Sequence, residues 1–411
     1  MTEVCQKIST WIDDHFADEV AMLQALVRKP SDNPPGDCTP HALMTAELLR
    51  DLGLDVDVLT VPAERVSAAG MISATNLIVR YKFGEGPVVA LNAHGDVVPP
   101  GSGWTKDPYG AEIEDGWLYG RGAAVSKSDI ASYTYALLAL KHSAAPLNGS
   151  VELHITYDEE TGGHTGPAWL LESGASRPDY AVCAALSYFV VTAHNGCLHL
   201  EVKVSGKSAH AAFPDTGHDA IETGHLLMAE IYKYRDTLRD KHSSVSGIDQ
   251  PTLVIGLIKG GINTNVVSDN FSLRLDRRII PEEDPQLVEQ EILDLITDFA
   301  DQHPAITVTA ERILLSEPFA PTGNSQALAD IFSQQAEKRL GMTIPQVGLP
   351  LYTDARLYSR AGIPTIMYGA GPRSYLEANG HRADERVGLE DLRHATHIIA
   401  SSLNSLLGGK L

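Results

Sequence analysis

The chain has 411 residues, and its 32 Lys and Arg against 53 Asp and Glu give a formal net charge of −21 at pH 7. A composition of 43% hydrophobic and 21% charged residues is typical of a folded globular protein and excludes wholesale disorder. The excess of acidic groups argues against nucleic acid or an anionic membrane surface as a partner. At roughly 150 residues per domain, the length predicts two or three domains.

The sequence also predicts the compartment. No stretch approaches the roughly 18 consecutive apolar residues of a membrane helix, and the first residues lack the basic start and apolar core of a secretory signal. The four cysteines are scattered without C-x-x-C spacing, which favours thiols in a reducing cytoplasm over a disulfide framework or a thiolate metal site. We therefore expect a cytoplasmic protein.

The first part of the chain alternates helices and strands. Apolar residues at helical spacing precede continuous apolar runs, which are typical of strands buried on both faces of a mainly parallel sheet. The expected helices are 8–27, 41–52 and 127–140, and the expected strands are 76–81, 87–92 and 151–157. This alternation predicts an α/β domain.

From about Gly196 the order changes to strand, helix, strand, strand, helix, strand, which is the split ferredoxin-like order. The corresponding ranges are 198–204, 219–238, 252–258, 271–275, 285–299 and 306–310. A helix at 325–340, a strand at 365–368 and a helix at 389–407 then complete the first domain. We expect a larger α/β domain of residues 1–193 and 312–411, with an inserted ferredoxin-like domain at 194–311.

Polar side chains follow two of the expected strands, where α/β folds place their sites. His94 and Asp96 follow one strand, Glu159 and Glu160 follow another, and His381 lies in a late loop. Taken singly, a loop histidine is more often solvated than a ligand, and an acidic run is more often a helix N-terminus. Taken together, these residues favour metal-assisted hydrolysis.

Short motifs in a fixed order carry a family resemblance. They are His94-x-Asp96, Gly120-Arg121-Gly122, Asp158-Glu159-Glu160-x-Gly162, Ser208-Ala209-His210, Gly260-Gly261-x-Asn263-x-Asn265, Asp276-x-Arg278, Thr353-Asp354-Ala355-Arg356 and His381. This set resembles the di-zinc amidohydrolases and exopeptidases, a family that includes acetylornithine deacetylase, succinyl-diaminopimelate desuccinylase, aminoacylase and glutamate carboxypeptidase. The resemblance covers nearly the whole chain. It implies a zinc-exopeptidase-like mixed sheet with helices on both faces.

The resemblance also implies roles for the strand-end residues. His94 matches the histidine ligand of the first zinc, and Asp96 matches the carboxylate that supports it. Glu159 matches the general base that deprotonates the attacking water. Glu160 and His381 match ligands of the second zinc.

Further roles fall on the inserted domain. His210 matches a histidine that reaches the partner subunit's site and stabilises the oxyanion, while Asn265 and Arg278 match groups that contact the substrate. The family is commonly dimeric through this domain, so we expect a homodimer or a larger oligomer. Arg373, in a glycine-rich loop eight residues before His381, is a further candidate for binding a substrate carboxylate.

The chain departs from the family at two expected metal ligands. Val125 stands where the family has an aspartate that bridges both metals, and Ala185 stands where it has an acidic ligand of the first metal. A zinc pair without this carboxylate clamp is implausible. Two interpretations remain: a single ion among His94, Glu160 and His381, or no metal and altered chemistry. We favour the single ion, since that set suits zinc, manganese or iron.

Asp129 lies one helical turn after Val125 and has two interpretations. It is a replacement metal ligand, or a helix N-terminal carboxylate that interacts with the dipole, and we favour the second.

The predicted function is hydrolysis of a C–N bond in a small carboxylate-bearing substrate such as an N-acyl amino acid or a dipeptide. One alternative is a hydrolytic deaminase of an aromatic amine, of the 5-nitroanthranilate aminohydrolase type. Another is a binder of small carboxylates without catalysis, although such a binder has no need of Glu159.

Overall fold

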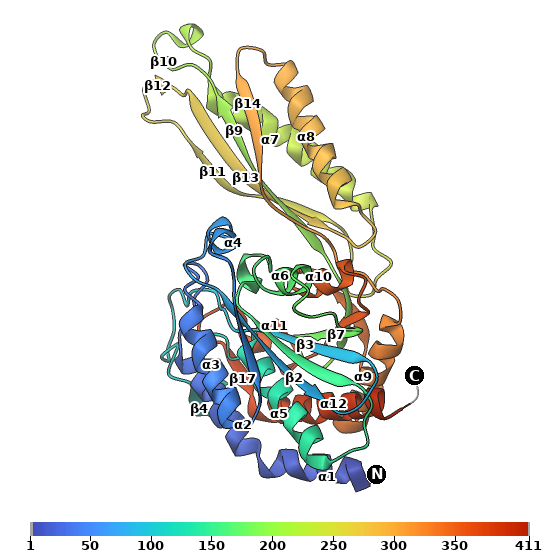
Figure 1. Cartoon of the computed structure of the whole chain (residues 1–411). Helices are drawn as coiled ribbons and strands as arrows, with labels where there is room; N and C mark the ends of the chain where they lie inside the picture. The colour runs from blue at the N-terminus through green and yellow to red at the C-terminus, as the bar shows by residue number, and fades with distance from the viewer. Residues whose placement is uncertain (1–2, 410–411) are drawn as a thin grey trace. The chain divides into compact units, whose positions relative to one another are not determined.

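The computed structural model describes residues 3–409, which form two compact units (Figure 1). The first unit holds the described residues up to Thr192, together with Pro321–Gln346 and the described residues from Thr353 onward. The second unit holds Ala193–Ala320 and Val347–Tyr352. The division into independent domains at 193/194 and 311/312 stays a prediction.

The first unit is built on an eight-stranded sheet. Its order is β1 (Val56–Thr60), β2 (Thr75–Lys82), β6 (Ser150–Thr156), β3 (Val88–His94), β7 (Tyr180–Cys183), β16 (Thr365–Met367), β8 (Val190–His194) and β15 (Gln346–Leu349). The four central strands, from β6 to β16, run parallel, whereas β1, β2 and β8 pair antiparallel to their neighbours. This arrangement confirms the predicted mixed, mainly parallel sheet.

Helices cover both faces of this sheet, as Figure 1 shows with α5 (Lys127–Ser143) and α12 (Leu389–Gly408) on one side and α6 (Pro167–Glu172) and α10 (Ala355–Arg360) on the other. Almost every residue of α5 is buried, because α1 (Glu3–Asp14), α2 (Phe16–Arg28) and α12 surround it on the side away from β3. Of the remaining helices, α9 (Ser325–Leu340) packs against α12, α3 (Thr39–Asp51) packs against β1 and β2, and α4 (Ala63–Ala68) follows β1. Polar groups in the first turn of α5 are therefore held in the protein interior.

A small three-stranded sheet supports the late loop of this unit. Its strands are β4 (Glu112–Glu114), β5 (Trp117–Tyr119) and β17 (Arg386–Gly388), with β5 in the centre. The short helix α11 (Tyr375–Ala378) precedes β17. The loop between α11 and β17 carries His381, so pairing of β17 with β5 anchors its far end.

The second unit is a four-stranded antiparallel sheet with two helices. The strand order is β11 (Thr252–Gly260), β13 (Asn270–Ile279), β9 (Gly196–Ser205) and β14 (Thr307–Ser316), and the helices are α7 (Ala220–Thr237) and α8 (Pro285–Asp301). Alternate residues of β9, from Leu198 to Val204, are buried against the helices, because side chains alternate between the two faces of a strand. The predicted ferredoxin-like order is thus present.

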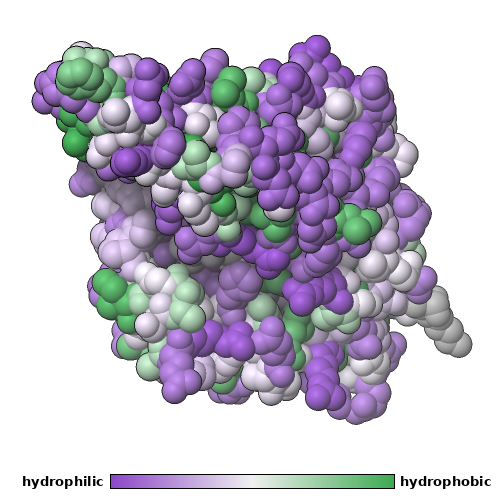
Figure 2. Space-filling model, turned by 90° about the horizontal axis from the view of Figure 1, so that it is seen from above, coloured by the Kyte–Doolittle hydropathy of each residue, from purple (hydrophilic) through white to green (hydrophobic). Residues whose placement is uncertain are grey.

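Polar residues dominate the exterior. The face shown in Figure 2 is largely hydrophilic, and its hydrophobic residues form small separate patches. Within residues 3–409, no helix combines the length and apolar character needed to cross a membrane.

Candidate metal centre

Asp96 connects the ends of two neighbouring strands. Strand β3 ends at His94, whose Nδ1 lies 2.9 Å from the Asp96 carbonyl oxygen and 3.4 Å from its Oδ1. The Asp96 carboxylate accepts hydrogen bonds from the backbone N–H groups of Glu159 and Glu160, at 3.3 and 3.2 Å. Asn33 donates to the same carboxylate at 3.0 Å. These contacts fix the orientation of the His94 ring against the loop that follows β6.

The structure brings four predicted residues together at this edge of the sheet. Glu160 Oε1 lies 3.3 Å from His381 Nε2, and Glu159 Oε2 lies 3.9 Å from His94 Nε2. One ligand atom each from His94, Glu159 and Glu160 lies within 4.8 Å of the other two. His381 enters from the late loop with a left-handed φ of 60°. Strand ends and a distant loop thus converge on one cluster.

Negative charge exceeds positive charge in this cluster. The pKa of Glu159 is raised to about 7, because burial and the charges of Glu160 and Asp96 together outweigh the opposing effect of His94. Burial also raises the pKa of the adjacent Asp158 to about 7. For His94, burial lowers the pKa, but the hydrogen bond with Asp96 and the charge of Glu159 outweigh it and leave the pKa well above its usual value.

This charge imbalance fits a bound cation. Glu160 Oε1 is buried and pairs with His381 Nε2 at 3.3 Å. Both carboxylate oxygens of the buried Asp354 lack a hydrogen-bond donor, and the negative charge of Glu159 adds to burial in raising the pKa of Asp354 well above the usual range. Buried carboxylates without partners are costly, and a divalent ion removes that cost.

Two positions where ligands were expected carry no donor atom. A side chain at Gly380 would lie 3.8 Å from Val125 Cγ2, so a methyl group borders the glycine that precedes His381. The Ala185 backbone lies against Gly369. Neither Val125 nor Ala185 has a side-chain atom that can ligate a metal, whereas His94, Glu160 and His381 offer two imidazoles and a carboxylate.

Asp129 takes a position that neither interpretation from the sequence described fully. It lies in the first turn of α5, as expected, but its Oδ1 accepts a hydrogen bond of 2.8 Å from the N–H of Ala370. Its Oδ2 is buried without a donor, and burial raises the pKa of Asp129 to about 8. Its carboxylate therefore lies against the loop after β16 and contacts Gly369.

Three further residues contribute to the cluster; Asp354 and Tyr375 had no predicted role, whereas Arg356 was a candidate for binding a substrate carboxylate. Asp354 belongs to a motif noted in the sequence, whereas Tyr375 belongs to none. Burial and the charges of Glu159, Asp129 and Glu160 raise the pKa of Tyr375, which locates it beside the carboxylates. Arg356 donates hydrogen bonds of 2.6 Å to the carbonyl oxygens of Gly162 and Thr353 and so braces the loop that carries Glu159 and Glu160.

Other predicted residues belong to the second unit. His210 lies on β10 (Ala209–His210), and its Nδ1 accepts a hydrogen bond of 3.0 Å from the N–H of Ala212. The Asn265 carbonyl accepts from the Ala211 N–H at 3.0 Å, just before β12 (Val266–Val267), which pairs with β10. Arg278 lies on β13 and donates to Asp276.

Arg373, in the first unit, packs its guanidinium 4.5 Å from the centre of the Tyr188 ring, and its backbone N–H donates to Glu377. The Tyr188 hydroxyl donates to Asp391 of α12 at 2.5 Å. Arg373 thus lies on an exposed surface of the loop that leads to His381.

The mixed sheet and the histidine–carboxylate cluster define a metal-dependent hydrolase class. Residues 90–405 match the model of peptidase family M20/M25/M40, and the chain therefore belongs to that family. This finding confirms the resemblance seen in the sequence. It makes the chain a metallohydrolase that acts on carbon–nitrogen bonds.

Individual relatives agree with this assignment. Succinyl-diaminopimelate desuccinylase from Gluconacetobacter diazotrophicus is 31% identical over 403 residues, which cover 95% of this chain and 97% of that protein. Human carnosine dipeptidase 1 has a similar fold, with a TM-score of 0.74, 16% identity and 98% of both chains covered. The Bacillus subtilis YXEP protein, described as a dinuclear metal-binding peptidase, matches with a TM-score of 0.69, 16% identity and coverage of 96% and 99%.

Proposed function

We propose that the protein hydrolyses the amide bond of a small carboxylate-bearing substrate, such as an N-acyl amino acid or a dipeptide, with one divalent ion held by His94, Glu160 and His381. The observation that carries the proposal is that ligand atoms of His94, Glu159 and Glu160 lie within 4.8 Å of one another, with His381 Nε2 3.3 Å from Glu160 Oε1. The desuccinylase and dipeptidase relatives support the substrate class. Zinc and manganese both suit this donor set.

The ion, when bound, supplies a water of lowered pKa and polarises the substrate carbonyl. Glu159 accepts the proton of this water at a carboxylate oxygen as the new C–O bond forms. It then gives the proton to the nitrogen as the C–N bond breaks, so a carboxylic acid and an amine leave. Asp96 holds both the His94 ring and the backbone of Glu159 and therefore acts as a positioning residue.

Three residues of the second unit take supporting roles in this proposal. His210, from a second protomer, stabilises negative charge on the carbonyl oxygen. Asn265 and Arg278 bind the substrate. Arg373 is a further candidate for binding the substrate carboxylate.

Glu159→Gln tests the catalytic role. Amine release from N-succinyl and N-acetyl amino acids and from dipeptides is measured with zinc or manganese present, and metal content is determined for every sample. The variant should lose roughly 10²–10⁴-fold in turnover, because a general base is removed, while it still binds metal. Glu172→Gln, at an exposed carboxylate paired with Arg65, is the matched control and should retain full activity.

Other outcomes would contradict the proposal. Turnover unchanged in Glu159→Gln would remove the proposed base. Ammonia release from an aromatic amine, without amide hydrolysis, would establish the deaminase alternative. Ligand binding without turnover, unaffected by Glu159→Gln, would establish a binder.

We also propose that two copies of the chain form a homodimer through β11, the outer strand of the second unit. Its exposed side chains include Val254, Leu257 and Ile258, each more than half exposed. An apolar strand edge without a neighbouring strand promotes aggregation unless another chain covers it. Two copies of the same edge, related by a two-fold axis, can pair with each other. Light scattering should give the dimer mass for the wild type and the monomer mass for Leu257→Lys; a monomeric wild type would refute the proposal.

The proposed location is the cytoplasm, for which the scattered cysteines without C-x-x-C spacing are the support.

A further inference from the structure

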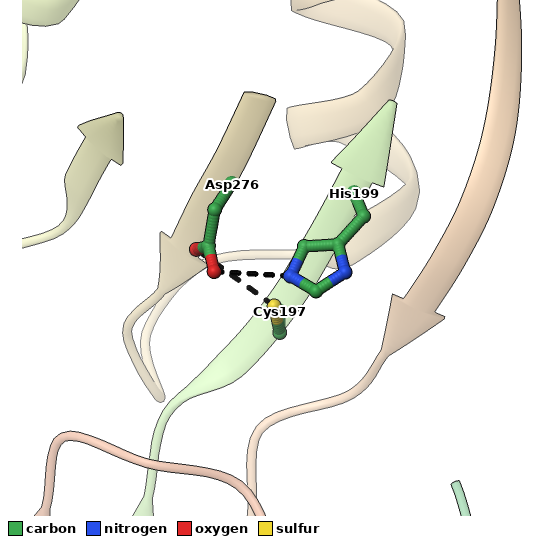
Figure 3. Close-up of side chains that lie close together, drawn as sticks. All are labelled: Cys197, His199 and Asp276. Atoms are coloured by element: carbon green, nitrogen blue, oxygen red, sulfur yellow. Dashed lines mark hydrogen bonds and ion pairs between the residues drawn. The ribbon is translucent and has the colours of Figure 1, made fainter. Parts of the chain in front are cut away.

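A second group of metal-binding side chains lies in the second unit, on neighbouring strands. Cys197 and His199 stand two residues apart on β9 and therefore share one face of the sheet. In the register of β9 and β13, His199 lies opposite Asp276 and Cys197 lies opposite Arg278. Figure 3 shows the three ligand-type side chains of Cys197, His199 and Asp276 turned toward one another from these two strands.

The spacing of these atoms is close to that of a tetrahedral zinc site. His199 Nε2 lies 3.0 Å from Asp276 Oδ2, and Cys197 Sγ lies 3.9 Å from Asp276 Oδ1. One ligand atom of each residue lies within 4.8 Å of the other two. Zinc bonds of about 2.0–2.3 Å at tetrahedral angles place neighbouring ligand atoms roughly 3.3–3.8 Å apart. Small rotations of the side chains would therefore seat the ion.

Charge and access are also suitable. The Arg278 guanidinium donates to both Asp276 oxygens, at 2.9 and 3.0 Å. His199 and Cys197 take the other two of the roughly four lone-pair directions of the carboxylate, and these two directions become available to a metal when both side chains bind the ion instead. Cys197 is buried, and its Sγ points to the Asp276 carboxylate. The side chains of His199 and Asp276 are 34% and 32% exposed, which leaves a path for an ion and room for water as a fourth ligand.

We propose that Cys197, His199 and Asp276 form a binding site for Zn²⁺ or another thiophilic divalent metal ion. The sequence lacks C-x-x-C spacing, so no thiolate site was predicted from it. The site could not be found from spacing, because its carboxylate belongs to a strand nearly eighty residues further along the chain. A bound ion would cross-link β9 to β13 and fix the carboxylate on which Arg278 rests. The proposal does not depend on the proposed hydrolase function, since none of its residues belongs to the His94 cluster.

Cobalt titration of the full-length chain tests the site. Co²⁺ bound by a thiolate gives a near-ultraviolet sulfur-to-metal charge-transfer band, which the histidines and carboxylates of the His94 cluster cannot give. We expect the band in the wild type, in His381→Ala and in Cys183→Ser, a control that removes a different buried cysteine. We expect no band in Cys197→Ser and at least a tenfold weaker affinity in His199→Asn.

Added Zn²⁺ should compete with Co²⁺ and abolish the band once about one Zn²⁺ ion has been added for each of the two clusters in the chain. Absence of the band in the wild type, or its persistence in Cys197→Ser, would overturn the site. If Cys197→Ser does not fold, the partly exposed His199→Asn decides, because unchanged cobalt affinity in that variant would overturn the proposal equally. Failure here would leave amide hydrolysis untouched, which separates the two proposals.

Discussion

The two clusters of metal-binding side chains differ in how their carboxylates are paired. In the His94 cluster, burial raises the pKa of Glu159 and Asp158 to about 7, and both carboxylate oxygens of the buried Asp354 lack a donor. In the Cys197 cluster, Asp276 accepts from His199 and Arg278; although burial raises its pKa, these partners hold it below its usual value. The first cluster is deficient in positive charge, whereas the second is balanced.

This difference indicates how tightly each cluster should hold an ion. A cation in the His94 cluster relieves repulsion among carboxylates that the fold has already brought together. A cation in the Cys197 cluster must replace the hydrogen bond between His199 and Asp276 and also displace the thiol proton. We therefore expect the His94 cluster to bind divalent metal more tightly.

The largest expected effect follows from Glu160→Gln. With metal, the variant should bind far more weakly, by more than the roughly 10–100-fold that loss of a supporting residue costs. Without metal, it should have a higher melting temperature than the wild type, because one of several crowded carboxylates becomes neutral. Isothermal titration and thermal melts in chelator measure the two effects.

The opposite signs make this test specific. Glu172→Gln, whose carboxylate is exposed, should change neither quantity appreciably. A Glu160→Gln variant that is destabilised in chelator as well would mean that its carboxylate is already satisfied, contrary to the proposed charge imbalance.

Part of this cluster could be predicted from the sequence. His94, Glu159 and Glu160 follow apolar strands, and parallel strands end at one edge, so their proximity follows from the pattern. His381 has no such local rule and was identified through the family motif. The order of strands and helices in the inserted unit was likewise predicted from the sequence pattern, and the structure has that order.

The parts that could not be predicted depend on loops and packing. Tyr375 and Asp354 reach the cluster because the loops after β16 and β15 fold back on it, and no apolar period records that path. Asp129 lies in the first turn of its helix, as expected, but its carboxylate also accepts a hydrogen bond from Ala370, 241 residues away, which the sequence pattern did not predict. Long-range partners of this kind are set by tertiary structure.

The second, smaller effect is expected at Glu385, a carboxylate that is already paired with a positively charged side chain. Glu385 pairs with Arg121, both are fully buried, and Glu385 also accepts from the N–H groups of Ala124 and Val125 at 3.2 Å. Glu385→Gln should destabilise the fold by about 3–5 kcal/mol, because Arg121 is left as a buried charge without its partner. Urea unfolding measures this, with Glu172→Gln at the exposed Arg65 pair expected to cost at most about 1 kcal/mol.

If Glu385→Gln and Glu172→Gln lower the free energy of unfolding by the same amount, burial does not determine the strength of these ion pairs. Burial would then also be a poor guide to how strongly the His94 cluster attracts a cation.

The smallest effect is expected for Asp276→Asn in the Cys197 cluster. Its partners Arg278 and His199 stay partly exposed, so water replaces the lost contacts and the cost in metal-free buffer should be about 1 kcal/mol or less. Excess Zn²⁺ should then raise the melting temperature of His381→Ala more than that of the His381→Ala, Asp276→Asn double variant, since only the former keeps the Cys197 cluster intact. His381→Ala as the common background weakens binding at the His94 cluster in both. An equal rise in melting temperature in the two proteins would mean that Asp276 does not bind the metal. Its carboxylate would then act only by pairing with Arg278 and His199.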